Sequence, residues 1–205
     1  MHGKAILVEV QNIAVIGAGP VGRAIALAAV SVGIPTVLED VMRSTLLDAV
    51  TWIEQKLETN IVNEPYVDIT RRNLALISLS TANSAEDAIR EADLIIETVP
   101  EELEMKLELF TIFDKFAKPG AIFASTAKKL SVADFSDVTV YRERCVGMRF
   151  LEVDSAIYRI ELVKTPHTSE ETVGACLAFA RRLNKEVLLT TDSSGQDSQV
   201  WSSGK

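Results

Sequence analysis

Residues 13–22 read IAVIGAGPVG, and this stretch decides the fold of the chain. The run from Ile13 to Ile16 is apolar, which is typical of a strand buried on both faces of a parallel sheet. A glycine-rich turn follows, and residues 24–30 (AIALAAV) then carry the small apolar side chains of a helix that packs closely on a sheet. The order of strand, turn and helix predicts a dinucleotide-binding βαβ unit.

The three glycines of the turn have separate expected roles. Gly17 makes the tight turn, Gly19 lets the backbone approach a pyrophosphate, and Gly22 lets the helix lie close to the strand. The diphosphate is expected against Pro20 and Val21, because free N–H groups and the helix dipole favour an anion at a helix N-terminus. Glycines at this spacing also occur in ordinary turns, so the neighbouring elements carry the prediction.

A second short strand, predicted from Thr36 to Leu38, ends at an acidic pair, Glu39 and Asp40. Asp40 lies 23 residues beyond Gly17 (40 − 17), close to the spacing of the carboxylate that binds the ribose of a dinucleotide. We expect Asp40 to accept hydrogen bonds from the adenosine hydroxyls and to repel a 2′-phosphate. The sequence therefore predicts NAD, and not NADP, as the cofactor.

Composition argues against several classes of function. The chain has 205 residues, of which 47% are hydrophobic, so it can bury a substantial core. Its formal charge of −8 and the lack of a Lys/Arg stripe argue against nucleic acid or a membrane surface as partner. No apolar run approaches the roughly 20 residues that span a bilayer, and no secretory signal is evident, so we expect a cytoplasmic location. Cys145 and Cys176 are expected to be buried free thiols, and neither histidine has partners at metal-ligand spacing, so no metal is predicted.

Strands and helices alternate along the rest of the chain. Helices are predicted at 44–60, from about 84, at 103–116, 132–135 and 169–183, and strands at 73–79, 92–99, 121–125, 144–150, 160–163 and 186–190. This alternation predicts a Rossmann-type α/β fold, doubly wound around a mainly parallel sheet, over residues 1–192. Residues 193–205 are polar and rich in Ser and Gly, so they are predicted to form a flexible tail.

The chain resembles the N-terminal, NAD-binding domain of the 3-hydroxyacyl-CoA dehydrogenases over nearly all of residues 10–192. The matching segments are the glycine loop with Asp40, residues 92–97 (ADLIIE), 100–106 (PEELEMK), 145–148 (CVGM) and 161–163 (ELV). The resemblance implies that Glu101 and Lys106 contact the cofactor. From the residues alone, the same pair reads as a solvated helix start and a surface charge pair.

The resemblance implies an oxidoreductase of fatty acid metabolism that acts on the CH–OH group of a 3-hydroxyacyl-CoA. In that family a histidine removes the hydroxyl proton, a glutamate orients the histidine, and a serine helps to hold the substrate oxygen. Arg149 stands at the position of the histidine, and Lys128 at that of the serine. Thr126 replaces a cofactor-side asparagine, whereas Glu161 is retained. A guanidinium keeps its proton at neutral pH, so we predict an Arg149–Glu161 ion pair without proton transfer.

Three hypotheses about function remain. The first is an NAD-binding protein with little or no activity. The second is an active dehydrogenase for a different 3-hydroxy acid or acyl-CoA, in which Lys128 acts as the base if burial neutralises its amine, or in which Lys128 or Arg149 binds an anionic group. The third is a non-catalytic partner of a related subunit. The family's helical C-terminal domain has no counterpart in this sequence, so we expect an exposed sheet face that a homodimer partner or another subunit covers.

Overall fold

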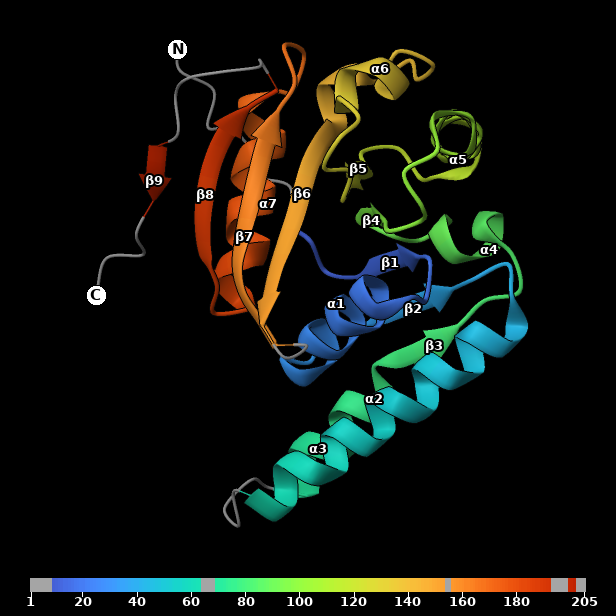
Figure 1. The fold of residues 1–205 in the computed structure, drawn as a ribbon, viewed down its shortest axis with the longest axis vertical. Helices are drawn as coiled ribbons and strands as arrows, with labels where there is room; N and C mark the ends of the chain where they lie inside the picture. The colour runs from blue at the N-terminus through green and yellow to red at the C-terminus, as the bar shows by residue number, and fades with distance from the viewer. Residues whose placement is uncertain (1–8, 64–68, 154–155, 193–198, 202–205) are drawn as a thin grey trace.

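The computed structural model of the chain describes residues 9–63, 69–153, 156–192 and 199–201. These residues form one nine-stranded sheet in the order β3-β2-β1-β4-β5-β6-β7-β8-β9 (Figure 1). The pairs from β3 through β6 are parallel, as are β7 and β8, whereas β6–β7 and β8–β9 are antiparallel. The predicted Rossmann-type, mainly parallel α/β fold is therefore confirmed.

The central strands are short and apolar because helices cover both of their faces. Every residue of β1 (Ile13–Ile16), β4 (Leu94–Glu97) and β5 (Ile122–Ser125) is buried. The other strands are β2 (Thr36–Glu39), β3 (Leu79–Thr81), β6 (Cys145–Val153), β7 (Ala156–Lys164), β8 (Glu186–Thr191) and β9 (Gln199–Trp201). The first five strands end at one common edge, which is where doubly wound sheets bind ligands.

The helices divide the core into two clusters, one on each face of the sheet. The first face carries α1 (Pro20–Ser31), α2 (Arg43–Asn63), α3 (Ile69–Ile77) and α7 (Glu170–Arg182). The second face carries α4 (Ala85–Ile89), α5 (Leu103–Phe116) and α6 (Val132–Ser136), and the 3₁₀ turn η1 (Arg142–Arg144) leads into β6. Four aromatic rings fill the second cluster, with centroids 4.8 to 6.3 Å apart, from Phe110, Phe113, Phe123 and Phe135. This packing fixes α5 beside the carboxyl edge of the sheet.

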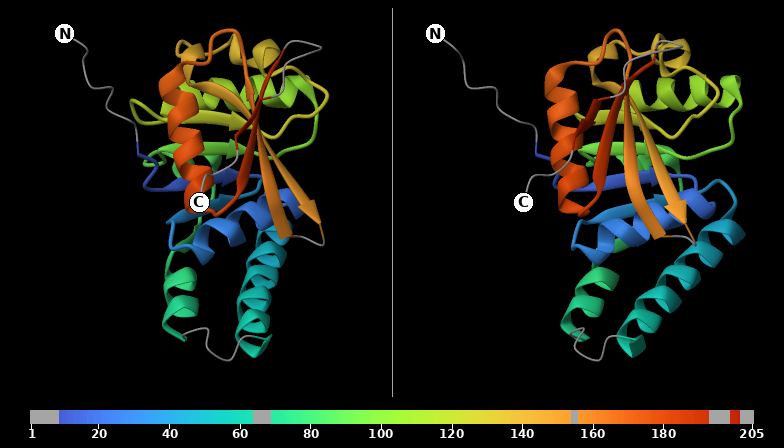
Figure 2. Two further views of the ribbon diagram at one scale, coloured as in Figure 1. Left: turned by 90° about the vertical axis from the view of Figure 1, so that its left-hand side faces the viewer. Right: turned by 60° about the vertical axis from the view of Figure 1, so that its left-hand side comes forward.

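The strand predicted at residues 73–79 is wrong, because most of this segment belongs to α3. Ala75 is buried and Leu76 packs against the core, whereas Leu74 is 54% and Ile77 80% exposed. The short apolar run fits a strand, but it belongs to a helix that buries only one narrow face. Together with α2, this helix forms a pair that extends away from the sheet (Figure 2).

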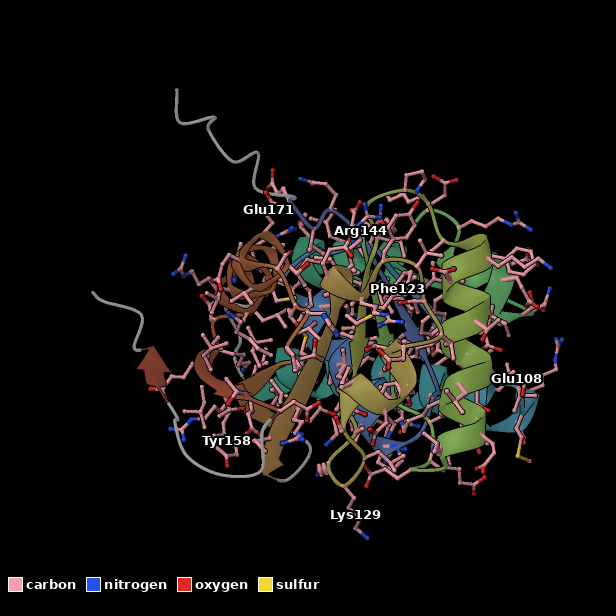
Figure 3. All side chains as sticks on the ribbon, turned by 90° about the horizontal axis from the view of Figure 1, so that it is seen from above. Glu108, Phe123, Lys129, Arg144, Tyr158 and Glu171 are labelled. Carbon is pink, nitrogen blue, oxygen red and sulfur yellow. The ribbon has the colours of Figure 1, made fainter. Side chains whose placement is uncertain are left out.

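The last described strand lies within the predicted flexible tail, whose flexibility stays a prediction. Residues 199–201 form β9, which pairs with the edge of β8, while the remaining residues of the predicted tail lie outside the described ranges. On the face of β7 and β8 opposite α7, Figure 1 shows no described helix over the strands, and α6 lies only at the start of β6. Tyr158 of β7 is 50% exposed (labelled in Figure 3). Within the described ranges, no helix is both long and apolar enough to cross a membrane.

Candidate functional site

The glycine loop after β1 has a geometry that side chains would prevent. Gly17 has a φ of +103°, and a Cβ there would lie 2.7 Å from Thr98 Oγ1. A Cβ on Gly22 would lie 1.9 Å from the Gly17 carbonyl oxygen. Only glycine at position 22 therefore lets α1 lie this close to the loop. A Cβ on Gly19 would meet no atom within 4 Å. The predicted roles of Gly17 and Gly22 thus match the packing, and the space beside Gly19 is open to a ligand.

The N-terminus of α1 keeps donors available for an anion. Gly19 occupies the N-cap position and Pro20 begins the helix, and no side chain of the described residues caps this end. The first turn carries no acidic side chain that could bind the free backbone N–H groups. These groups and the positive end of the helix dipole therefore face the open space. These residues fit the pyrophosphate of a dinucleotide, with Pro20 and Val21 where the sequence predicts them.

Asp40 joins the glycine loop to the end of β2. Its Oδ2 accepts a hydrogen bond from the Ala18 N–H at 2.8 Å, and its Oδ1 accepts one from the Met42 N–H at 2.8 Å. The neighbouring Glu39 carbonyl accepts from the Gly17 N–H at 2.8 Å. A carboxylate has about four acceptor positions, so both oxygens of Asp40 retain capacity for ribose hydroxyls. The geometry is compatible with ribose binding by Asp40, which stays a prediction.

Lys106 is buried in an ion pair and is not at the surface of the site. Its side chain is 0% exposed, and Nζ lies 2.8 Å from each carboxylate oxygen of Glu97, which is also 0% exposed. Ser125 Oγ donates to Glu97 at 2.6 Å, and the Val99 N–H donates to it at 2.7 Å. The cofactor contact expected of Lys106 is therefore not supported by this geometry, because the buried Glu97 carboxylate holds the ammonium below the surface.

Glu101 holds together two loops at the carboxyl edge. Its Oε1 accepts hydrogen bonds from the backbone N–H groups of Lys128 at 2.5 Å, Lys129 at 2.7 Å and Leu130 at 3.3 Å. Burial opposes ionisation, but these donors outweigh it and hold the pKa of Glu101 below its usual value. Glu101 thereby ties the loop after β4 to the loop after β5, and its predicted contact with a cofactor stays a prediction.

Glu101→Ala is expected to loosen the loop at residues 128–130. A hydrogen bond to a charged group contributes about 1.5 to 3 kcal/mol, so amide exchange there should accelerate by about tenfold or more. Hydrogen–deuterium exchange read by mass spectrometry measures this change. Glu104→Ala removes an exposed carboxylate from the first turn of α5 and serves as the control. Equal exchange rates in both variants would show that Glu101 does not hold the loop.

Arg149 and Glu161 form the predicted ion pair. They stand opposite each other on β6 and β7, with Arg149 Nη1 3.3 Å from Glu161 Oε2 and both side chains 20% exposed. Arg149 Nε also donates to the Ala127 carbonyl at 2.7 Å, and Thr190 Oγ1 donates to Glu161 Oε1 at 3.2 Å. The guanidinium thus connects two strands and the loop after β5, and it offers no acceptor for a proton.

The other predicted residues near this pair are placed differently. Lys128 is exposed, so the burial needed to make its amine a base is lacking, and the hypothesis of a Lys128 base loses its support. Lys129 is exposed beside it and projects away from the loop (Figure 3). Thr126 is partly buried, and its N–H donates to the Glu97 carbonyl at 3.0 Å. Its predicted side-chain contact with a cofactor stays a prediction.

The cysteines are buried and free, as expected. Burial raises the pKa of Cys145 and of Cys176 to about 12, so both stay thiols at neutral pH. In the part of the chain that the structure describes, no group of three or more His, Cys, Asp or Glu residues is arranged to hold a metal ion.

Three polar residues of the carboxyl edge were not predicted from the sequence. Glu97 and Ser125 complete the buried network around Lys106. Asp192 accepts from Ser131 Oγ at 2.5 Å and from the Ala133 N–H at 3.2 Å, and so holds the start of α6. The sequence does indicate Glu97 and Ser125 as candidates for a buried polar contact, since each is a polar residue at the last position of an otherwise apolar strand.

The sequence model described as "3-hydroxyacyl-CoA dehydrogenase, NAD binding domain" matches residues 12–193. The chain belongs to this family. Hydroxyacyl-coenzyme A dehydrogenase, mitochondrial, from Sus scrofa is 31% identical over 94% of the chain and 62% of that protein. A 3-hydroxybutyryl-CoA dehydrogenase from Bradyrhizobium diazoefficiens is 30% identical over 89% of the chain and 62% of that protein. The crystal structure of M. tuberculosis FadB2 superposes with a TM-score of 0.83 at 26% identity, covering 91% of this chain and 66% of that one.

Membership of the family assigns the open space beside the glycine loop to NAD. The glycine loop, the N-terminus of α1 and Asp40 lie at the edge of the sheet where this fold binds its ligand, and their contacts with NAD stay a prediction. The chain spans about three fifths of the curated relatives named above, which are longer proteins.

Proposed function

We propose that this chain is an NAD-binding domain of the 3-hydroxyacyl-CoA dehydrogenase family with little or no dehydrogenase activity of its own. The observation that carries the proposal is the Arg149–Glu161 pair. It lies on β6 and β7 beside the loop after β5, where the resemblance puts the base. The glycine loop is well formed, whereas Arg149 donates to the Ala127 carbonyl and to the Glu161 carboxylate and accepts no proton.

The chemistry of the family explains why this pair matters. NAD, when bound, supplies the hydride acceptor, and the protein must supply a group that takes the hydroxyl proton of the substrate. Arg149 cannot take it, and Lys128 is exposed, so it lacks the burial that would make its amine a base. Loss of a general base typically lowers the rate by about a hundredfold to ten-thousandfold. We therefore expect NAD binding without appreciable turnover.

The proposed ligand besides NAD is a 3-hydroxyacyl or 3-oxoacyl thioester of coenzyme A, in fatty acid metabolism. Support comes from the two relatives, one named for hydroxyacyl-coenzyme A and one for 3-hydroxybutyryl-CoA. The fold is shared over more than nine tenths of this chain with FadB2. A 3-hydroxy acid without coenzyme A is the alternative ligand class.

Calorimetric titration with NAD, with NADP and then with acetoacetyl-CoA tests the proposal. NAD is expected to bind and NADP not, and 3-hydroxybutyryl-CoA with NAD should give no NADH above background. Ready turnover would contradict the proposed loss of activity, and absence of NAD binding would contradict the cofactor site.

Asp40→Ala is expected to weaken NAD binding about tenfold to a hundredfold, because hydrogen bonds from the ribose to a carboxylate are lost. The titration should be repeated with Asp48→Ala, which removes an exposed acid from α2 and should leave the affinity unchanged. An unchanged affinity in Asp40→Ala would overturn the ribose assignment.

A second candidate function is a non-catalytic subunit whose open sheet face docks on a partner. The observation that favours it is the face of β7 and β8 that no described helix covers, with Tyr158 half exposed on β7. Size-exclusion chromatography with light scattering tests this candidate. A stable dimer that Tyr158→Glu converts to a monomer would support it, whereas a monomer at all concentrations would remove the case for a homodimer.

A further inference from the structure

Glu39 is a buried carboxyl group beside the NAD site, and neither the fold nor the proposed function uses its side chain. It is the last residue of β2 and only 6% exposed. In the described residues, no donor hydrogen-bonds to its carboxyl group and no cation pairs with it. A buried carboxyl group without such a partner is costly in its ionised form.

Its position couples the group to the cofactor site. The Glu39 carbonyl anchors the Gly17 N–H, and the adjacent Asp40 anchors the Ala18 N–H. In the sheet register Glu39 lies beside Ile16, the last residue before the glycine loop. The Glu39 carboxyl group interacts electrostatically with Asp40, so charge on Glu39 acts on the residue proposed to hold the adenosine ribose.

Burial and two neighbouring carboxylates disfavour the ionised form of Glu39. Of the other charged residues on helices packed against β2, Asp87 lies in the first turn of α4, and Arg23 of α1 lies over the Trp52 ring. Burial is the largest effect, followed by Asp40 on the same strand and Glu86 in the first turn of α4, and together they raise the pKa of Glu39 to about 7. The neighbouring residues of β1, of β3 and of the loop at 17–19 bring no ionisable side chain. A bound dinucleotide would add the negative charge of its pyrophosphate and displace water from this edge, and both changes favour a neutral Glu39.

We propose that NAD binds the chain with Glu39 protonated, so that this carboxyl group sets the affinity of the adenosine subsite according to pH. When the group is ionised, binding takes up one proton from the solvent. The inference rests on the NAD site and not on the proposed loss of activity, so it stands or falls independently of turnover.

Titration of the chain with NAD at about pH 6 and about pH 8 is the first test. If only the protonated form binds, one group that titrates midway between these values makes the dissociation constant rise about tenfold. Glu39→Gln, a neutral group of the same shape, should bind NAD equally at both values, with the affinity that the unaltered chain has at the lower pH. Glu91→Gln removes an exposed acid from the amino-terminal side of β4, so this control should keep the tenfold rise.

Proton uptake gives a second measurement that needs no variant. Calorimetry at about pH 8 in buffers of different ionisation enthalpy should show about one proton taken up per NAD bound. A dissociation constant that does not change with pH, or a full rise retained in Glu39→Gln, would overturn the proposal.

Tighter binding at the higher pH would also overturn it, because Glu39 would then act as an ionised acceptor for the adenine amine. Absence of NAD binding at both pH values would overturn the cofactor site itself. Turnover of NAD with an acyl-CoA would contradict only the proposed function.

Discussion

Lys106→Met is expected to lower the free energy of unfolding by about 3 to 5 kcal/mol, because it leaves the Glu97 carboxylate buried without its cation. Both side chains are 0% exposed, and Nζ contacts both carboxylate oxygens. The remaining donors, Ser125 Oγ and the Val99 N–H, are neutral and cannot compensate a full charge on a side chain that is 0% exposed. Urea unfolding followed by circular dichroism measures the change.

Two further variants separate the ion pair from the simple loss of a lysine. Lys115→Met makes the same substitution at an exposed position of α5 and should change stability by no more than about 0.5 kcal/mol. Lys106→Met combined with Glu97→Gln removes both charges and should be more stable than Lys106→Met alone. If the double variant were as unstable as the single one, the lost packing of the lysine stem, and not the uncompensated charge, would explain the effect.

The buried lysine shows where the sequence could have predicted more than it did. Leu103, Phe110 and Phe113 form an apolar stripe of α5, and Lys106 lies on that same stripe at helical spacing. A charged residue on a buried face needs a buried partner, and the acid at the end of the preceding apolar strand, Glu97, is the obvious one. The resemblance to the family implies a contact between Lys106 and the cofactor instead.

Local features were predictable because the residues that form them are adjacent in the sequence. The strand, glycine loop, helix and Asp40 all lie within residues 13–40, and the structure confirms the two strands and the helix between them. The Arg149–Glu161 pair was predictable for a different reason, since it required only that the chain keep the register of its family. The hydrogen bond from Arg149 to the Ala127 carbonyl was not predictable, because a backbone acceptor has no signal in the sequence. The distance of 3.3 Å within the ion pair was not predictable either.

The same reason explains what was missed around Glu101. Its partners are three backbone N–H groups of a loop 27 to 29 residues away, and no side chain in that loop indicates them.

The misassigned strand at 73–79 has another cause. A run of few residues fits both a strand and a helix, and the tertiary packing of α3 decided between them.

Arg149→His is expected to raise the turnover of a 3-hydroxyacyl-CoA with NAD by about a hundredfold, because it puts a proton acceptor opposite Glu161. Glu161 already accepts a hydrogen bond from Thr190, so its carboxylate is held in place to receive the imidazole N–H and to stabilise the imidazolium. The gained rate should depend on pH, with a rise centred above about pH 6.5, because the Glu161 carboxylate favours the charged imidazole and raises its pKa. NADH formation with 3-hydroxybutyryl-CoA at saturating NAD measures it.

The matched variant is Arg149→Gln, which also removes the guanidinium and its bond to the Ala127 carbonyl but supplies no base. The loop after β5 should stay in place in both variants, because Glu101 holds its backbone independently of Arg149. If Arg149→His forms NADH faster than Arg149→Gln, the difference in rate therefore reports proton transfer and not a change of loop position. Adding Glu161→Gln to Arg149→His should reduce this difference. Equal rates in the two variants would mean that the missing base is not what limits this chain, and the cause would then lie in how the acyl substrate is held.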